Sequence, residues 1–268
     1  MIRGLYTAAS GMITQQQRQD TLTNNLANID TPGFKAKQGM IRAFPEVLIN
    51  AIRLTNNVPN VVGPLHQGVF IEENVPVFSQ GDLIDTGTAT HMAILDKDLE
   101  VNPETGKKPA LFFTLEDENG NRFYTRSGLF TVDAAGQLVT PEGYLVLDDF
   151  WFPIEVNGRS FTIDDKGNIA FEDGENVKVG LTVIDDTSLL ENKGNQMYLF
   201  TGDEETLGYV DDNAKYNLYQ GKIERANVDP AQTMIDMTTA LRLYEANQTV
   251  IQSIDQTLQK AVNEIGRI

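Results

Sequence analysis

The clearest pattern in the chain begins at Asp229-Pro-Ala-Gln-Thr-Met-Ile-Asp-Met-Thr-Thr-Ala-Leu241 and continues to the last residue. Apolar residues recur there at alternating spacings of three and four, the heptad spacing of a helix that packs on another helix. Asp229 is a favourable N-cap, and Pro230 fits the first helical turn. The pattern predicts a C-terminal helix. Its seam comprises Met234, Met237, Leu241, Tyr244, Ile251, Leu258, Val262 and Ile265, with Gln248 and Asp255 as polar interruptions.

A second helical pattern lies at the other end of the chain, where Leu5, Met12 and Leu22 keep a similar spacing. This seam is thinner because glutamines fill the turns between its apolar residues. Thr31-Pro-Gly33 ends the pattern, since proline cannot continue a helix. Helices at both termini predict that the two ends meet and pair as a coiled coil, from which the middle projects. The alternative is that each helix packs only on its own domain.

The charge of the chain is concentrated in its middle. The chain has 268 residues and a net charge of −17, of which residues 41–220 carry −18, residues 1–40 carry +2 and residues 221–268 carry −1. Nearly neutral ends rich in Gln, Asn, Thr and Ala are typical of surfaces that pack against protein, which favours pairing with other molecules. The acidic middle excludes nucleic acid as a partner, because phosphate recognition needs clustered Lys and Arg.

Short strands separated by turn residues predict β structure in the middle. Three turns of this kind are Asp117-Glu-Asn-Gly-Asn121, Asp133-Ala-Ala-Gly136 and Asp164-Asp-Lys-Gly167. The spacing, with no helical pattern between strands, indicates an antiparallel sandwich or barrel-like domain in an α+β fold. A short apolar helix is expected between Phe44 and Leu54. The predicted organisation is an N-terminal helix and turn (1–34), a connecting region (35–80), a β-rich domain (81–220) and a C-terminal helix (221–268).

Three ordered blocks of the chain resemble the bacterial flagellar rod and hook proteins. The first is Gly4-Leu-Tyr-Thr-Ala-Ala-Ser-Gly-Met12 with Asn24-Asn-Leu-Ala-Asn-Ile-Asp-Thr-Pro-Gly-Phe-Lys35. The second is Tyr124-Thr-Arg-Ser-Gly-Leu-Phe130 through Gly143-Tyr-Leu-Val-Leu147, and the third includes Ala240-Leu-Arg-Leu-Tyr-Glu-Ala-Asn247. The chain looks most similar to distal-rod or rod–hook members. It departs from the family pattern at His91, where Asp is usual, and by an insertion between Asp96 and Pro109.

The resemblance implies a structural subunit of the rod or rod–hook region that polymerises through its terminal helices. It implies a place in the flagellar basal body and export through the type III apparatus without a cleaved signal peptide. The implied partners are copies of the chain, neighbouring rod and hook subunits and the export apparatus, with no membrane insertion. The implied assembly motif is Asn24, Asn25, Leu26, Ala27, Asn28, Thr31, Pro32, Gly33 and Phe34, and the assembly seam adds Leu5, Met12 and Leu22 to the C-terminal residues.

The residues offer little for catalysis or cofactor binding. Cysteine is absent, and the two histidines, His66 and His91, lie far apart without partners at metal-ligand spacing. No run approaches the roughly 20 apolar residues of a membrane span, and the N-terminus lacks the apolar core of a secretory signal. We therefore expect no catalytic residues, metal or cofactor. Two alternatives remain: a cell-wall glycan hydrolase with two carboxylates, and a secreted acidic binding module.

Overall fold

The computed structural model describes residues 2–45, 47–52, 59–65, 68–96, 108–203, 207–209 and 216–265. The chain forms two compact units. The helical unit contains residues 1–27, 37–76 and 229–268, and the β unit contains residues 28–36 and 77–228. His66 and most of the insertion between Asp96 and Pro109 lie outside the described residues. Each unit therefore contains residues from distant parts of the chain.

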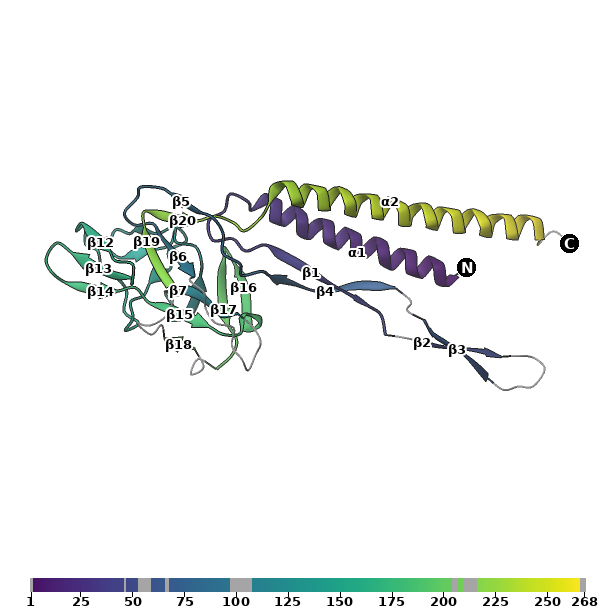
Figure 1. Cartoon of the computed structure of the whole chain (residues 1–268), viewed down its shortest axis with the longest axis horizontal. Coiled ribbons are helices and arrows are strands. Elements are labelled where there is room, and N and C mark those ends of the chain that lie inside the picture. The colour runs from purple at the N-terminus through teal and green to yellow at the C-terminus, as the bar shows by residue number, and fades with distance from the viewer. Residues whose placement is uncertain are drawn as a thin grey trace. The chain divides into compact units, whose positions relative to one another are not determined.

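The helical unit is built on two long helices, α1 (Ile2–Ala27) and α2 (Pro230–Lys260), and α2 continues as a π-helical turn over Ala261–Ile265. The two helices lie side by side (Figure 1). They run antiparallel, because Gly4 approaches Ile254 while Gly11 approaches Asn247. The predicted N-cap is confirmed: Asp229 Oδ1 accepts hydrogen bonds from the Ala231 and Gln232 N–H groups at 2.9 and 3.1 Å. The prediction that the terminal helices pack together is also confirmed.

A β ribbon completes the helical unit (Figure 1). It consists of β1 (Lys37–Ala43) paired with β4 (Val69–Pro76) and β2 (Val47–Ile52) paired with β3 (Pro59–Leu65), both antiparallel. The expected short helix after Phe44 is wrong. A short apolar run does not distinguish helix from strand by periodicity, and here pairing with β3 satisfies the backbone of β2. The Thr14 hydroxyl donates to the Val69 carbonyl at 3.0 Å, which attaches the ribbon to α1.

The β unit contains antiparallel strands throughout its described residues. Its largest sheet has the order β16-β17-β8-β7-β11-β10-β9, with β15 also pairing with β7 and β18 with β15. The bounds in this sheet are β7 Ala110–Glu116, β8 Arg122–Thr125, β9 Thr131–Val132, β10 Leu138–Val139, β11 Leu145–Val146, β15 Leu181–Ile184, β16 Leu190–Gly194, β17 Met197–Phe200 and β18 Gly208–Tyr209. A 3₁₀ turn, η1 (Thr187–Leu189), precedes β16. The described strands do not close into a barrel, so the barrel-like alternative is not observed.

Smaller sheets surround this one. Their strands are β5 (Leu83–Asp85), β6 (Met92–Asp96), β12 (Phe161–Ile163), β13 (Asn168–Phe171), β14 (Asn176–Lys178), β19 (Tyr216–Gln220) and β20 (Lys222–Glu224). β12, β13 and β14 form one sheet, while β6 pairs with β19 and β5 with β20. The three predicted turns each join paired strands, namely β7 to β8, β9 to β10 and β12 to β13.

The core of the β unit lies on both faces of β7. Leu111, Phe113 and Leu115 point into the larger cluster, and Phe112 points into a second cluster with Tyr198. A strand buried on both faces reads as a continuous apolar run, as Ala110-Leu-Phe-Phe113 does. This core makes the β unit a rigid platform for the polar residues described next.

Candidate assembly site

Two glycines of α1 lie close to side chains of α2. A Cβ atom added at Gly11 would lie 2.8 Å from Asn247 Nδ2, and one added at Gly4 would lie 3.4 Å from Ile254 Cδ1. Ala8 on α1 and Ala240 on α2 are buried. Small side chains at these positions let the two helix backbones approach closely. The residues of α2 that approach α1, together with buried Ala240, form a row spaced by seven: Ala240, Asn247 and Ile254.

The predicted seam divides into two groups in this unit. Its half-buried members are Leu5, Met12, Leu22, Met237, Tyr244, Ile251 and Leu258. Met234, Leu241 and Val262 are instead 54%, 43% and 71% exposed. Ile265 lies in the π-helical turn, and its side chain is outside the description. Part of the predicted seam therefore remains uncovered in the single chain.

Further apolar side chains of both helices are exposed. On α1 these are Tyr6 and Ile13, and on α2 they are Ile235, Leu243 and Val250. Met234 and Leu241 are seven residues apart and lie along one side of α2. Leu243 and Val250 are also seven apart, and the 200° between positions 241 and 243 places this pair on nearly the opposite side. The second helix thus carries exposed apolar residues on two sides.

In the predicted motif at the end of α1, the side-chain amide of Asn25 forms the two hydrogen bonds that a backbone peptide would form. Asn25 is buried, its Nδ2 donates to the Lys37 carbonyl at 2.8 Å, and its Oδ1 accepts from the Lys37 N–H at 2.9 Å. This pair of bonds extends the hydrogen bonding of β1 and ties the first residue of the ribbon to α1. Asn24 and Ala27 are exposed, while Leu26, Asn28, Thr31 and Pro32 are half-buried.

The end of the motif belongs to the β unit. The Gly33 N–H donates to the Glu224 carbonyl at 2.8 Å, and Phe34 is buried. Gly33 has φ = +71°, and a Cβ atom there would lie 2.4 Å from the Ser127 nitrogen. Only glycine meets both demands, because other residues rarely adopt positive φ and any side chain would collide with the backbone. The motif thus joins residues 28–36 to the β unit.

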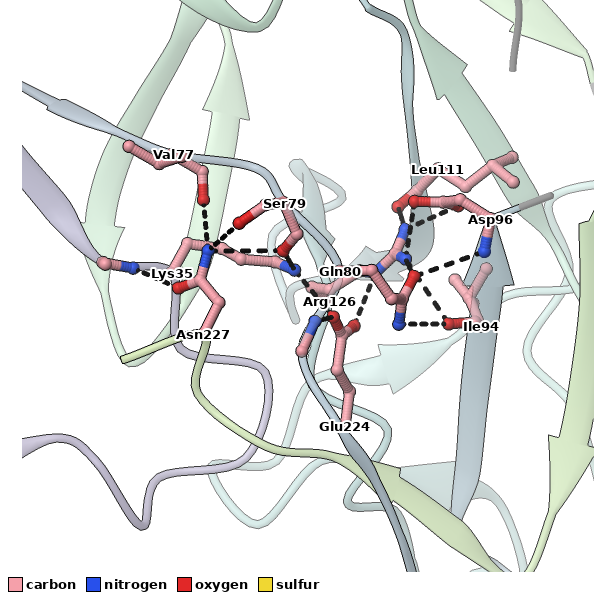
Figure 2. A network of polar contacts seen from close by, with 12 residues as sticks. Lys35, Val77, Ser79, Gln80, Ile94, Asp96, Leu111, Arg126, Glu224 and Asn227 are labelled. Carbon is pink, nitrogen blue, oxygen red and sulfur yellow. Dashed lines mark hydrogen bonds and ion pairs between the residues drawn. The ribbon is translucent and has the colours of Figure 1, made fainter. Parts of the chain in front are cut away.

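A buried charged network follows this turn (Figure 2). Lys35 Nζ lies 2.7 Å from Glu224 Oε1, and Arg126 Nε lies 2.7 Å from Glu224 Oε2. Arg126 Nη2 also lies 2.8 Å from Asp96 Oδ2. Lys35, Arg126 and Glu224 are almost completely buried. Two cations and two carboxylates therefore balance one another inside the β unit.

Backbone groups and the side chain of Gln80, whose Oε1 accepts from Arg126 Nη2 at 2.8 Å, satisfy further polar atoms of the network. Lys35 Nζ donates to the Ser79 carbonyl at 2.8 Å, and Arg126 Nη1 donates to the Leu111 carbonyl at 2.6 Å. The Gly81 N–H donates to Glu224 Oε1 at 2.7 Å. Buried charges need this degree of satisfaction, because an unpaired buried charge is strongly destabilising.

The network changes the proton affinity of its two cations in opposite directions. Burial lowers the pKa of Lys35 below its ordinary value of 10.5, although Glu224 opposes the change. Burial alone would also lower the pKa of Arg126, but Glu224 and Asp96 together raise it. Arg126 therefore remains charged, and the Glu224 carboxylate is the group that both cations share.

Asn227 connects the chain before α2 to the same region (Figure 2). Its Nδ2 donates to the Val77 carbonyl at 2.7 Å and to Ser79 Oγ at 2.8 Å. Its Oδ1 accepts from the Ala36 N–H at 2.7 Å. One amide side chain thus joins segments that leave the first helix and enter the second, so both ends of the β unit are anchored together.

Sequence reasoning missed this network. Lys35 and Arg126 stand inside the blocks that carry the family resemblance, but nothing in the sequence pairs them with Glu224. The residues are 189 and 98 positions from Glu224. The available signal was a lysine that follows Phe34 directly after the uncharged turn Thr31-Pro-Gly33.

The described residues show no arrangement suited to metal binding: no group of three or more His, Cys, Asp or Glu side chains is placed to hold a metal ion in that part of the chain. His91 Nδ1 lies 2.8 Å from the Thr86 hydroxyl, and burial lowers the pKa of His91. No described helix is long and apolar enough to cross a membrane. The main features of the described residues are therefore the exposed apolar side chains of the two helices and the buried charged network of the β unit.

Three family models match the chain. One is described as flagella basal body rod protein and matches residues 5–35. A second, flagellar hook protein FlgE/F/G D1 domain, matches residues 110–171, and a third, flagellar basal body rod FlgEFG protein C-terminal, matches residues 219–264. The matches cover the N-terminal helix and turn, much of the β unit and the second helix.

Full-length relatives agree with these models. The flagellar hook-basal body complex protein FlhO of Bacillus subtilis is 37% identical over 272 residues, covering 100% of both chains. The flagellar basal-body rod protein FlgG of Borreliella burgdorferi is 32% identical over 278 residues, covering 98% of each. FlgG of Bacillus subtilis is 27% identical over 276 residues, covering 98% of this chain and 99% of the relative. These relatives are structural proteins of the flagellum and not enzymes, which supports a flagellar location for this chain. It belongs to the flagellar basal-body rod and hook protein family.

Proposed function

We propose that this chain is a structural subunit of the rod or rod–hook region that polymerises through α1 and α2. The observation that carries the proposal is the set of exposed apolar side chains on the paired helices. A helix that carries apolar residues on several sides is typically buried on those sides. Here α1 covers only one side of α2, so the remaining apolar sides require other molecules.

Other copies of the chain are the partner that fits both helices. The terminal segments are nearly neutral, whereas residues 41–220 carry a net charge of −18. Copies can therefore approach through their helices without bringing like charges together. In this proposal the helices of neighbouring subunits extend the α1–α2 pair into a coiled-coil layer.

The family supports the remaining parts of the proposal. Relatives are named as components of the basal body and its rod, so neighbouring rod and hook subunits are the natural further partners. We also propose export through the flagellar type III apparatus without a cleaved signal peptide, which the absence of cysteine permits because no disulfide must form. Residues 1–34 and 221–268 would assemble, residues 35–80 would connect, and residues 81–220 would form the outer domain.

The test places a charge on an exposed apolar position of α2. Ile235 is 58% exposed, so Ile235→Asp should leave the single chain folded. In a polymer the same carboxylate would be buried without a partner, at a cost of several kcal/mol in every subunit. The matched control is Ile235→Leu, which changes the same exposed position without adding a charge.

We expect cells with Ile235→Asp as their only copy to be non-motile and to build no flagellar structure beyond this subunit. Ile235→Leu cells should swim normally, because the position stays apolar. Electron microscopy of isolated basal bodies, with circular dichroism of the purified variants, provides the measurement. Normal assembly by folded Ile235→Asp would show that this side of α2 is not an assembly surface.

A further inference from the structure

An exposed aromatic turn lies between β11 and β12 in the β unit. Phe150 is 77% exposed and Phe152 is 67% exposed. No other large apolar side chain described in the β unit exceeds 40% exposure. Two exposed phenylalanines within one short turn are unusual on a protein surface and mark a contact site when they are held in place.

The backbone of this turn is held firmly. Asp148 Oδ1 accepts hydrogen bonds from the N–H groups of both Phe150 and Phe152, each at 2.8 Å. The Trp151 N–H donates to the Asp148 carbonyl at 3.1 Å, and the Asp148 N–H donates to the Phe152 carbonyl at 2.8 Å. These bonds fix the direction in which the two phenylalanines project.

Trp151 gives the turn an unusual conformation. Its φ is +68°, in the region that glycine adopts easily and a bulky residue does not. The Arg122 guanidinium lies 4.0 Å from the centre of the indole ring, which stabilises the tryptophan there. A turn that keeps a strained tryptophan and two exposed phenylalanines is preorganised, so little ordering entropy is lost when it binds.

We infer that the turn formed by residues 148–152 docks on the β unit of a neighbouring copy of this chain. The inference rests on the proposed function, in which the helices hold copies side by side. At the stated exposures the two phenylalanines offer about 300 Å² of apolar surface. A stable complex between free proteins needs about 800 Å² from each partner.

The small area therefore favours a partner that is already held close to the turn over one that diffuses freely. A freely diffusing protein would bind this turn too weakly to remain bound. A copy already held nearby by its helices is present at a high effective concentration, so the same contact becomes effective. The turn also presents uncharged rings at the surface of an acidic region, which permits contact between like-charged subunits.

Photo-crosslinking in assembled basal bodies tests this inference. The change is Phe150→p-benzoylphenylalanine, which keeps an aromatic ring at an exposed position, and Phe152→p-benzoylphenylalanine is the second probe. The control places the same residue at Glu172, an exposed position in another turn of the β unit. Irradiation is followed by isolation of basal bodies, denaturing electrophoresis and mass spectrometry of the crosslinked peptides.

The expected result is a light-dependent product of twice the chain mass from the probes at 150 and 152, with both peptides from this chain, and no such product from position 172. Crosslinks to a different protein, equal crosslinking at all three positions, or no product from basal bodies that contain the chain would each overturn the inference. Failure of the proposed function is distinguishable, because it would appear as normal assembly of Ile235→Asp whatever the crosslinks show.

Discussion

Replacing Glu224 with glutamine is the sharpest test of the buried network. The Glu224 side chain is 1% exposed, and its two oxygens accept from Lys35, Gly81 and Arg126, each at 2.7 Å. A glutamine has one acceptor oxygen and one NH₂ group. At least one of the three donors must then face another donor, and of the two buried cations only Arg126 keeps a carboxylate partner, Asp96.

The size of the effect follows from which partners remain. Arg126 keeps Asp96, whereas Lys35 keeps the Ser79 carbonyl and loses Glu224, its carboxylate at 2.7 Å. Removing one partner of a buried ion pair costs about 3–5 kcal/mol. A domain is stable by only about 5–15 kcal/mol, so Glu224→Gln should remove a large part of the stability of the β unit.

Trp151 provides the assay. It is the single tryptophan of the chain and lies in the β unit, so its fluorescence during urea unfolding reports this unit alone. With a slope of about 2 kcal/mol per M urea, the midpoint should fall by about 2 M. The control is Glu142→Gln, at an exposed position of the same unit, which should change stability by less than about 0.5 kcal/mol.

Lys35→Met in the Glu224→Gln background separates a lost contact from an unpaired charge. It removes the cation that the first change left without its carboxylate, so part of the stability should return. If Glu224→Gln unfolds at the same urea concentration as Glu142→Gln, the network makes no net contribution and the reasoning is refuted.

Three further outcomes are expected. Gly33→Ala should destabilise the β unit by several times more than Gly87→Ala in urea unfolding, because both glycines have positive φ but only the first lacks space for a Cβ atom; equal losses would contradict the steric argument. Asn25→Ala should lower the thermal midpoint of the helices, followed by circular dichroism, through a loss of about 1–3 kcal/mol, whereas Gln16→Ala on the exposed surface should not. Burial raises the pKa of Tyr198 from 10 to about 12, so the folded state keeps a proton that the unfolded state loses. Stability should therefore fall as pH rises from 10 towards 12, by up to about 1.4 kcal/mol per pH unit, and Tyr198→Phe should remove that part of the slope; an unchanged slope would count against the assignment.

The terminal helices could be predicted because their signals are local. Asp229, Pro230 and the spacing of the apolar residues lie within a few turns of one another, and the structure confirms the N-cap. Not every residue of the row Ala240, Asn247 and Ile254 stands out by hydrophobicity. Met234 and Leu241 rank above Ala240 and Asn247 as apolar residues, yet Met234 and Leu241 are exposed, whereas Ala240 is buried and Asn247 approaches Gly11 of α1.

The ribbon shows a different limit of prediction from local sequence patterns. Residues 47–52 form a short apolar run that suits a buried helix or a strand equally well. Pairing with β3 makes this run a strand. β3 begins at Pro59, outside the run whose periodicity was read. The turn at Gly33 was expected from Pro32 and Gly33 themselves, but the close approach of Ser127 was not.

The sequence by itself determined the elements whose causes lie close together in the chain: two terminal helices, antiparallel strands with their turns, the concentration of negative charge in the middle and the family resemblance. Only the tertiary structure decided the α1-facing row on α2, the pairing of Glu224 with Lys35 and Arg126, and the exposure of Phe150 and Phe152. The physical reason is that helix caps, turns and periodicity act over a few residues, whereas burial and ion pairing depend on which distant segments meet. Lys35 and Glu224 are 189 residues apart, and nothing short of the folded β unit brings them to 2.7 Å.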